Sequence, residues 1–526
     1  MKEKNKNGIY NTLFHWQNFR FKLVVEGVVI GLLSGLLVVA YRYAAEKSGE
    51  LTKEIYLNAK GNIGYIILMF VALMVIAYLV GKMVKSEPMA SGSGIPQVEG
   101  VLLRKLEMNW VSVVIKKFIG GVLALGAGLS VGREGPSVQM GAAIGQGYSR
   151  IFKRIKVEEK FLITSGASAG LAAAFNAPLA GVMFALEEVH KNFSPLVLIS
   201  AMSASLTADF ISKQFFGLKP VFSFSKVTAL PLKYYFYLIV LGIIIGIFGV
   251  IFNNTITKTQ DIYNSQRWLP AEFRPVVPFV LAGILGLTLP NLLGGGHKLI
   301  EELTKSNFTI HMLVIILVIK FLFTMISYGS GVPGGIFLPL LVIGALIGDI
   351  YGVTLTKAIN LDPKYVTNFM ILAMAGYFTA IVKSPVTGSI LITEMTGSFS
   401  HLLSLTLVSI TAYVVTDILK SGPIYEILLE RFLKNNKEDE FVGDSKRKVL
   451  LESAVIVGSM VEGKKIRELK WPEKCLLVGI KRGNKELIPK GNTTIYPGDY
   501  LIVLVEEDKA SQIRDVIVQM SGQCVL

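Results

Sequence analysis

The pentapeptide Gly132-Arg133-Glu134-Gly135-Pro136 combines two charged side chains with a backbone that can turn sharply, and it lies inside apolar sequence. The flanking residues 118–131 and 137–149 contain no charged side chain. A carboxylate at membrane depth is costly and by default indicates function. Pro136 suits the first turn of a helix, and a helix that begins here aims free N–H groups and its positive dipole end at the preceding loop. The pentapeptide therefore predicts an anion site beside a titratable carboxylate, that of Glu134.

The glycine spacing of this region occurs twice in the chain. The matched blocks are residues 126–136 with 329–339 and residues 176–188 with 383–395. Their offsets are 203 residues (339 − 136) and 207 residues (385 − 178). In this register Gly132 corresponds to Gly335 and Pro136 to Pro339. Two ordered blocks at similar offsets indicate one domain built from two related halves, a design common in secondary transporters, although the alignment leaves open whether the halves are inverted or parallel.

The halves differ in their titratable residues. The aligned pairs are Arg133 with Ile336, Glu134 with Phe337, Glu187 with Glu394 and Glu188 with Met395. The second half thus offers a helix start of backbone N–H groups alone, while the first half adds groups that can carry protons. We expect one scaffold to hold the anion and one half to handle protons.

A third glycine-rich turn, residues 92–100 (GSGIPQVEG), places the hydroxyl of Ser93 beside further free N–H groups. Taken alone this pattern is an ordinary loop. A phosphate-binding loop is disfavoured, because no Gly-Lys-Ser/Thr follows.

The composition places these motifs in a membrane. Hydrophobic residues make up 52% of the 526 residues and charged residues only 17%, so we expect one large membrane domain with a smaller appendage. Apolar segments recur from Leu23 to Leu419, and many are shorter than the ~20 residues of a full span, which is typical of helices that end at a substrate site inside the membrane. The net charge of +15 fits basic cytoplasmic loops beside anionic lipid, and no nucleic-acid partner is expected.

Two other function classes are disfavoured. No nucleophile–base pair and no metal-ligand spacing accompanies the apolar segments, so we expect neither an enzyme nor a bound metal or cofactor. A cation transporter would need carbonyl rings or acidic pockets, whereas helix starts favour anions.

The motifs GSGIP at 92–96, GREGP at 132–136 and GGIFLP at 334–339 together resemble the three anion-binding helix starts of the CLC family of chloride channels and chloride/proton antiporters. The resemblance covers roughly residues 20–430. It implies the CLC fold, a polytopic α-helical membrane protein of two inverted-topology repeats with many partial, tilted helices. It also implies a homodimer with one pore per subunit, and with the attached tail described below it looks prokaryotic.

The resemblance assigns the chloride-binding residues. Ser93 corresponds to the pore serine of the family and Tyr425 to its pore tyrosine. Their hydroxyls would hold a dehydrated chloride together with the backbone N–H groups of Ile336 and Phe337. Serine at position 93 favours chloride, since nitrate-preferring relatives typically carry proline there.

The resemblance also assigns supporting and proton-handling residues. Glu134 resembles the gating glutamate, and Gly132 and Gly335 are supporting glycines at the two helix starts. Arg133 and Lys117 would raise the local positive potential, with snorkelling at a helix end as the alternative for Lys117.

Proton coupling needs a second acid that is reached from the cytoplasm. Glu188 matches the inner proton glutamate of the family, whereas Glu187, which recurs as Glu394, better fits a structural role. Glu99 would support the proton path or form a salt bridge. The predicted function is therefore chloride/proton antiport, with a passive voltage- or ligand-gated chloride channel of the same fold as the alternative.

A different pattern follows the membrane region. Short strands are expected at residues 454–457, 476–480, 486–488 and 500–505, with turns at Gly483-Asn484 and 497–499, and a helix over 510–520 with Ile513, Val516, Ile517 and Met520 on one face. This α+β segment resembles the RCK_C (TrkA-C) regulatory domain of ion transport systems. That resemblance implies a dimer and, in some relatives, a small ligand such as cyclic di-AMP; a domain that only stabilises the dimer is the alternative.

These observations give the expected organisation. The predicted parts are a cytoplasmic N-terminal segment, residues 1–22; the CLC transmembrane domain, 23–432, with halves of roughly 23–215 and 230–432; a charged linker, 433–449; and the regulatory domain, 450–526. We expect a multi-pass protein of the cell membrane with both termini in the cytoplasm.

Overall fold

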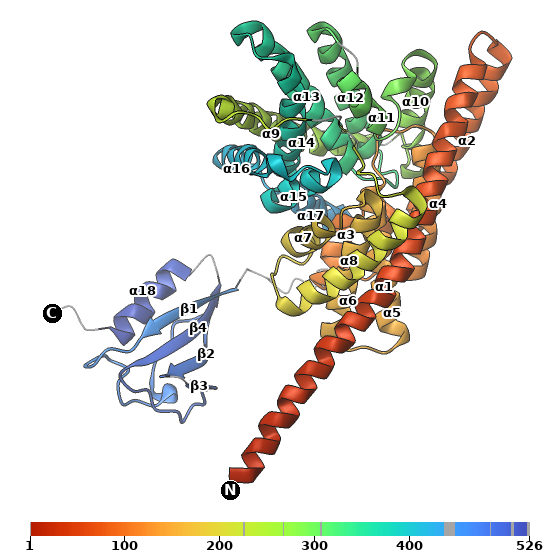
Figure 1. Ribbon diagram of the computed structural model, residues 1–526. Helices are drawn as coiled ribbons and strands as arrows, with labels where there is room; N and C mark the ends of the chain where they lie inside the picture. The colour runs from red at the N-terminus through yellow and green to blue at the C-terminus, as the bar shows by residue number, and fades with distance from the viewer. Residues whose placement is uncertain are drawn as a thin grey trace. The chain divides into compact units, whose positions relative to one another are not determined.

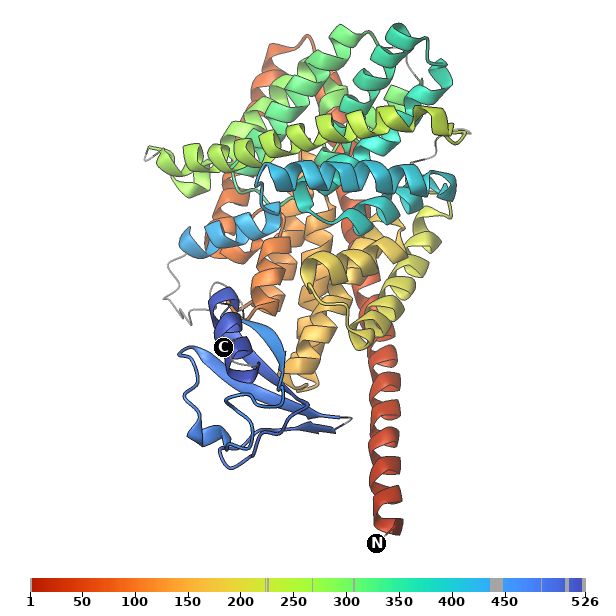
Figure 2. The ribbon, with the colours of Figure 1, turned by 90° about the vertical axis from the view of Figure 1, so that its left-hand side faces the viewer.

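The computed structural model describes residues 2–435 and 448–522, apart from residues 223, 225, 226, 267, 306, 307, 484 and 507–509. Side chains are described from residue 20 onward, apart from those of residues 157, 305, 435, 449 and 510–512. The chain divides into two compact units, residues 1–435 and 436–526. The first is a large assembly of helices and the second a small sheet with a helix (Figures 1 and 2).

The first unit contains helices of very unequal length. The longer ones are α1 (Lys2–Ala59), α2 (Ile63–Ser86), α4 (Trp110–Gly126), α5 (Glu134–Ile151), α6 (Lys156–Phe175), α8 (Pro195–Phe216), α9 (Tyr235–Ser265), α10 (Val276–Thr288), α12 (Ile310–Gly329), α13 (Phe337–Ile359), α14 (Val366–Val382) and α16 (Leu402–Ile418). The shorter ones are α3 (Ile95–Leu102), α7 (Pro178–Phe184), α11 (His297–Lys305), α15 (Pro385–Thr396) and α17 (Ile424–Asn435). Within the described residues, nine helical segments are long and apolar enough to cross a membrane.

Helix α1 runs through the polar residues 2–22 to Ala59 without a break. The apolar run of residues 162–186 is divided into α6 and α7, since Asn176 adopts a left-handed conformation (φ 52°) and Pro178 starts the next helix. Such breaks place helix ends inside the apolar unit.

The packing of the two halves repeats. Helix α6 contacts α5, α7 and α8, and α14 in the same way contacts α13, α15 and α16. The halves contact each other at several places, among them α7 with α15 and α2 with α10. Both α13 and α14 are largely buried, so the motif of residues 334–339 lies in the interior of the unit.

Glycines allow α5 to lie directly against α6. A Cβ added at Gly141 would lie 2.1 Å from the carbonyl oxygen of Gly166, and one at Gly166 would lie 2.0 Å from that of Gly141. Only glycine permits this approach, which is typical of helix pairs in membranes. The contact fixes α5, and therefore its first residue Glu134, against the rest of the first half.

The second unit is an antiparallel sheet of order β1-β4-β2-β3. Its strands are β1 (Lys448–Ala454), β2 (Cys475–Arg482), β3 (Lys485–Leu487) and β4 (Asp499–Glu506), and α18 (Ala510–Ser521) covers one face. The strand expected at 454–457 was wrong: β1 ends at Ala454, because the chain leaves the sheet towards Gly458, whose φ is 84°. Val516 was also wrongly placed, since it is exposed while Ile513 and Ile517 are buried.

The β2–β3 hairpin and the ends of the linker lie close to their expected positions. The hairpin expected at Gly483-Asn484 joins β2 to β3, where Arg482 pairs with Lys485, although Asn484 itself lies outside the described residues. Helix α17 continues to Asn435 and β1 already begins at Lys448, inside the expected linker 433–449, whose residues 436–447 also lie outside the description.

Candidate ion pathway

Gly132 and Gly335, which correspond in the repeat, are bonded to each other. Gly132 N donates to Gly335 O at 2.6 Å and Gly335 N donates to Gly132 O at 2.7 Å, as an isolated antiparallel bridge. A reciprocal bridge between equivalent residues has local two-fold symmetry, which indicates that the two halves are inverted relative to each other. Helices α5 and α13 therefore begin at the same place in the interior.

The Glu134 side chain is fully buried at this junction. A Cβ added at Gly132 would lie 2.3 Å from Glu134 Oε2 and 3.2 Å from Leu338 N, so the carboxylate faces the first turn of α13. Neither carboxylate oxygen accepts a hydrogen bond from another side chain within the described residues, and Arg133 Nε lies 4.0 Å from Oε1. The carboxylate thus lies where the free N–H groups of α13 would hold an anion.

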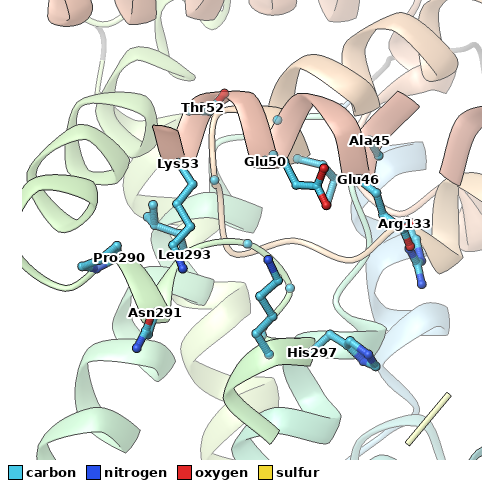
Figure 3. Close-up of a pocket in the computed structure, with 18 of the residues that line it drawn as sticks. Ala45, Glu46, Glu50, Thr52, Lys53, Arg133, Pro290, Asn291, Leu293 and His297 are labelled. Atoms are coloured by element: carbon cyan, nitrogen blue, oxygen red, sulfur yellow. The ribbon is translucent and has the colours of Figure 1, made fainter. Parts of the chain in front are cut away.

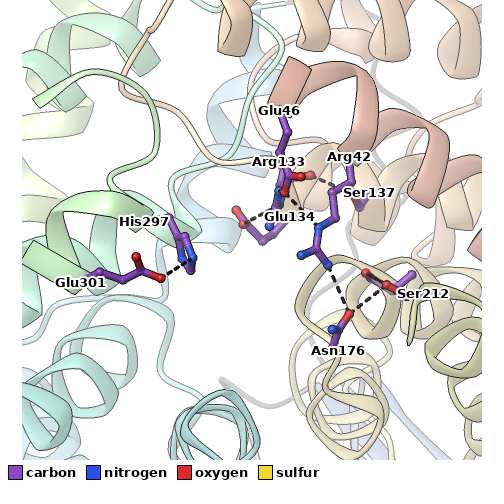
Figure 4. A network of polar contacts seen from close by, with 10 residues as sticks. Arg42, Glu46, Arg133, Glu134, Ser137, Asn176, Ser212, His297 and Glu301 are labelled. Atoms are coloured by element: carbon purple, nitrogen blue, oxygen red, sulfur yellow. Dashed lines mark hydrogen bonds and ion pairs between the residues drawn. The ribbon is translucent and has the colours of Figure 1, made fainter. Parts of the chain in front are cut away.

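Arg133 is held on its other side by residues that the sequence did not single out. Its Nη1 donates to Glu46 on α1, which also accepts from Arg42 Nε at 3.1 Å. Arg42 in turn donates to Asn176 at 3.2 Å (Figure 4). These residues are up to 134 positions apart, so no local pattern could have indicated the network.

A cavity of about 390 Å³ adjoins this network (Figure 3). Its lining includes Glu46, Arg133, His297 and Lys298, and it reaches Leu338 at the start of α13. The cavity therefore connects the charged network with the helix start that Glu134 faces.

The structure brings Ser93, Phe337 and Tyr425 together near Glu134. Ser93 lies in the turn before α3, and its Oγ would be 2.3 Å from a Cβ at Gly135. The aromatic ring of Phe184 lies 6.0 Å from that of Phe337 and 6.5 Å from that of Tyr425. Phe184 was missed, because a phenylalanine in an apolar run carries no distinctive signal.

The buried hydroxyls of Ser93 and Tyr425 are further groups without a hydrogen bond of standard geometry in the described chain. The Tyr425 hydroxyl lies within electrostatic reach of Ser93, Glu134 and Glu188. A hydroxyl can donate a hydrogen bond to an anion, so these two side chains are candidate donors of the site. Ile336, which precedes α13, is also buried.

Lys117 is fully buried, so the snorkelling alternative was wrong. Its Nζ donates to the carbonyl oxygens of Ala90, Ser91 and Gly92, at 3.1, 3.2 and 2.8 Å. The lysine therefore orients the carbonyls of the turn that contains Ser93.

Lys320 is the equivalent lysine of the second half, and it also donates to backbone carbonyl oxygens. It donates to Leu292 O at 3.1 Å and to Gly294 O at 2.6 Å, and it stands at the repeat offset of 203 residues (320 − 117). Extending the repeat register upstream would have found it.

Glu188 lies in a single turn of π-helix, η2 (Ala185–Val189), and is buried. Its Oε2 accepts from Ser384 Oγ at 2.8 Å. Glu99, also buried, accepts from Lys191 at 2.6 Å, and Lys191 pairs with Glu426 on α17 as well. Glu99 therefore forms the salt bridge that was one of its two expected roles.

Comparison with known proteins identifies the family. The model of the family described as voltage-gated chloride channel matches residues 72–417. The chain belongs to this CLC family. The resemblance on which the sequence interpretation relied is thus confirmed, and a TrkA-C domain matches residues 450–518.

Several CLC proteins are similar along most of their length. The H(+)/Cl(−) exchange transporter ClcA of Vibrio campbellii is 35% identical over 435 residues, which is 79% of this chain and 91% of the relative. ClcA of Yersinia pestis is 33% identical over 433 residues, 79% of this chain and 89% of the relative. The crystal structure of a slow cyanobacterial Cl−/H+ antiporter superposes with a TM-score of 0.76 at 31% identity, over 79% of this chain and 99% of that one.

Proposed function

We propose that this protein exchanges chloride for protons across the cell membrane. The placement of the Glu134 carboxylate at the first turn of α13 carries the proposal. An ionised carboxylate there competes with chloride for the same N–H groups, and a protonated one loses this attraction. One side chain can therefore couple the movement of the two ions. The similar proteins from Vibrio and Yersinia, named as H(+)/Cl(−) exchange transporters, support this function.

In this proposal the anion passes between Ser93, Tyr425 and the backbone N–H groups of Ile336 and Phe337. Neutral donors offset the dehydration of chloride without binding it too tightly for release. Arg133 contributes positive potential beside the path. Glu188, which is buried and lies within electrostatic reach of Tyr425, is the acid that exchanges protons with the cytoplasm.

Replacing Glu134 tests the proposal. In liposomes, Glu134→Ala should pass chloride but move no protons against their gradient, because the shared group is gone. Glu134→Asp keeps the carboxylate and serves as the matched control. Proton pumping by the alanine variant would contradict the gating role, and a wild-type protein that moves chloride without protons would favour a passive channel.

The surface of the helical unit is consistent with a homodimer, which we propose as the working assembly. Helices α8, α7, α15 and α16 contact one another in that order. They expose apolar side chains from both halves, namely Leu206, Phe210, Leu403 and Ile410. Single-molecule bleaching in liposomes would test it, with two steps per particle expected and one contradicting it.

We further propose that the TrkA-C domain regulates transport from the cytoplasm, where both termini would lie. The domain has its own apolar core, and the exposed Leu450 and Leu476 both pair across the sheet with Leu504, which leaves an apolar face suited to a second copy. Cyclic di-AMP is the candidate ligand. It should change chloride flux of the full chain but not of a chain lacking residues 446–526; equal effects would contradict a ligand site in the tail.

A further inference from the structure

The helix starts of α7 and α15 correspond in the repeat, but only that of α15 carries a hydroxyl at the N-cap position, that of Ser384. We propose that Ser384 is a positioning residue for proton transfer, which fixes one oxygen of Glu188 and leaves the other to exchange protons. The inference rests on the proposed antiport function and goes beyond it, because it concerns how this chain prepares its inner acid.

Ser384 occupies the N-cap position of α15 without acting as a cap. A serine there normally bonds the free N–H groups of the first turn, but the Ser384 side chain makes no such bond. The carboxylate of Glu187 takes those N–H groups instead, accepting from Val386 N at 3.3 Å and from Thr387 N at 2.7 Å. The Ser384 hydroxyl is therefore available for Glu188.

The bond to Glu188 is enclosed. Ser384 is 0% and Glu188 4% exposed, and the Oγ–Oε2 distance is 2.8 Å. Glu188 Oε1, in contrast, has no hydrogen-bond partner in the described part of the chain. The π-turn η2 adds a residue to the helix at this point, so that the consecutive Glu187 and Glu188 both face the start of α15.

The first half provides an internal comparison. There Glu394 caps α7, accepting from Leu179 N at 3.1 Å and from Ala180 N at 2.7 Å. The N-cap residue is Ala177, and Met395 stands where the second acid would be. The same helix start thus forms without a hydroxyl, which means that Ser384 is not needed for capping. The hydroxyl occurs in the half where it meets an acid.

Serine suits this task because its hydroxyl can both donate and accept. It donates to Glu188 while the carboxylate is ionised, and its lone pairs can accept from the acid once Glu188 carries a proton. The charged and titratable groups that act on Glu188 include Lys191, Glu99 and Glu426, and also Tyr425 on α17. Ser384 belongs to the opposite half of the unit. Because its hydroxyl is neutral, it fixes the carboxylate without changing the charge of that cluster.

Ser384→Ala tests the inference in liposomes that contain purified full-length protein. Without the donor the ionised form of Glu188 loses a stabilising hydrogen bond. The half-maximal pH of proton transport should rise by about one unit, and the protons moved per chloride should fall several-fold. Ser384→Thr, which keeps the hydroxyl, should restore both quantities.

Ser389→Ala is the matched control on the same helix. Ser389 is also buried, and its hydroxyl donates to Pro385 O at 2.9 Å rather than to Glu188, so its loss should leave the pH profile and the ratio unchanged. If Ser384→Ala does not fold, Ser384→Cys supplies a weaker donor of similar size and should give a smaller shift in the same direction.

Two outcomes overturn the inference and differ in what they say about the proposed function. Unchanged pH profiles in the alanine or cysteine variant, while Glu188→Gln abolishes proton transport, would remove Ser384 from the proton path and leave antiport intact. Proton transport that survives Glu188→Gln would overturn both the role of Glu188 and that of Ser384.

Discussion

Glu187 and Glu394 perform the same structural task in opposite directions: each carboxylate caps a helix that belongs to the other half of the unit. Glu187 accepts from the N–H groups at the start of α15, and Glu394 accepts from those at the start of α7. A carboxylate at a helix N-terminus satisfies free donors and complements the dipole. The exchange ties the two halves together at the contact between α7 and α15.

Neutralising either glutamate should therefore destabilise the helical unit, and Glu187 slightly more, because it also accepts from Thr387 Oγ1 at 2.7 Å. We expect Glu187→Gln and Glu394→Gln each to cost about 1 kcal/mol, the usual contribution of a cap, seen as a lower melting temperature of the lipid-reconstituted protein. Glu50→Gln, which removes an exposed pair with Lys47, is the control and should leave the melting temperature unchanged. A loss confined to one of the two caps would contradict their equivalence.

Ser93 should decide which anion passes. Ser93→Pro removes both a hydroxyl donor and a backbone N–H from the turn before α3, so we expect the preference for chloride over nitrate to fall several-fold. The ratio of initial chloride and nitrate fluxes measures it. Ser93→Thr retains the hydroxyl and should keep the wild-type ratio. An unchanged ratio in the proline variant would mean that Ser93 does not determine anion selectivity.

Glu46 should limit the attraction of anions to the cavity beside Arg133. Glu46→Gln removes a negative charge that now pairs with Arg133 and Arg42, so the apparent affinity for chloride supplied on that side should rise roughly two- to fivefold and the gain should shrink at high ionic strength. Glu50 lines the same cavity and pairs with Lys47 rather than with an arginine, so Glu50→Gln is the control. A reduced affinity would show that Glu46 is needed to hold Arg133 in place.

The tail contains a pH-dependent ion pair. Asp499 is buried, and although burial opposes the change, Arg482 bonds both its oxygens at 2.8 Å and lowers the pKa of this carboxyl. A carboxyl whose pKa is lower in the folded state stabilises above its unfolded pKa of about 3.9, and that contribution disappears as the pH falls through the folded value.

Asp499→Asn should therefore destabilise the tail by about 1–2 kcal/mol at neutral pH. The difference from the wild type should shrink below about pH 4. Fluorescence of Trp471, in a full-length chain whose other tryptophans are replaced by phenylalanine, reports the unfolding. A difference that stays constant down to pH 2 would contradict the ion-pair origin.

Much of the geometry of the candidate site could be predicted from sequence, because helix starts depend on local backbone chemistry. Glycines and prolines at fixed spacing indicated the helix starts at Gly132 and Gly335, and the repeat register predicted that these two residues correspond. Ser384, Glu46 and Lys191 could not be predicted, since their roles arise from packing between elements far apart in the chain. Similarly, β1 was placed too late because its polar Glu452 and Ser453 interrupt the apolar pattern that backbone pairing with β4 does not require.

The most direct test of the account is whether chloride can drive protons uphill through this protein and whether that depends on Glu188. Purified protein in liposomes would receive a chloride gradient, no initial pH gradient and a voltage set by an ionophore, and the external pH would be recorded. We predict uphill proton movement in the wild type and its loss in Glu188→Gln, which should still pass chloride. Chloride flux without proton movement in the wild type would contradict antiport and make the protein a channel.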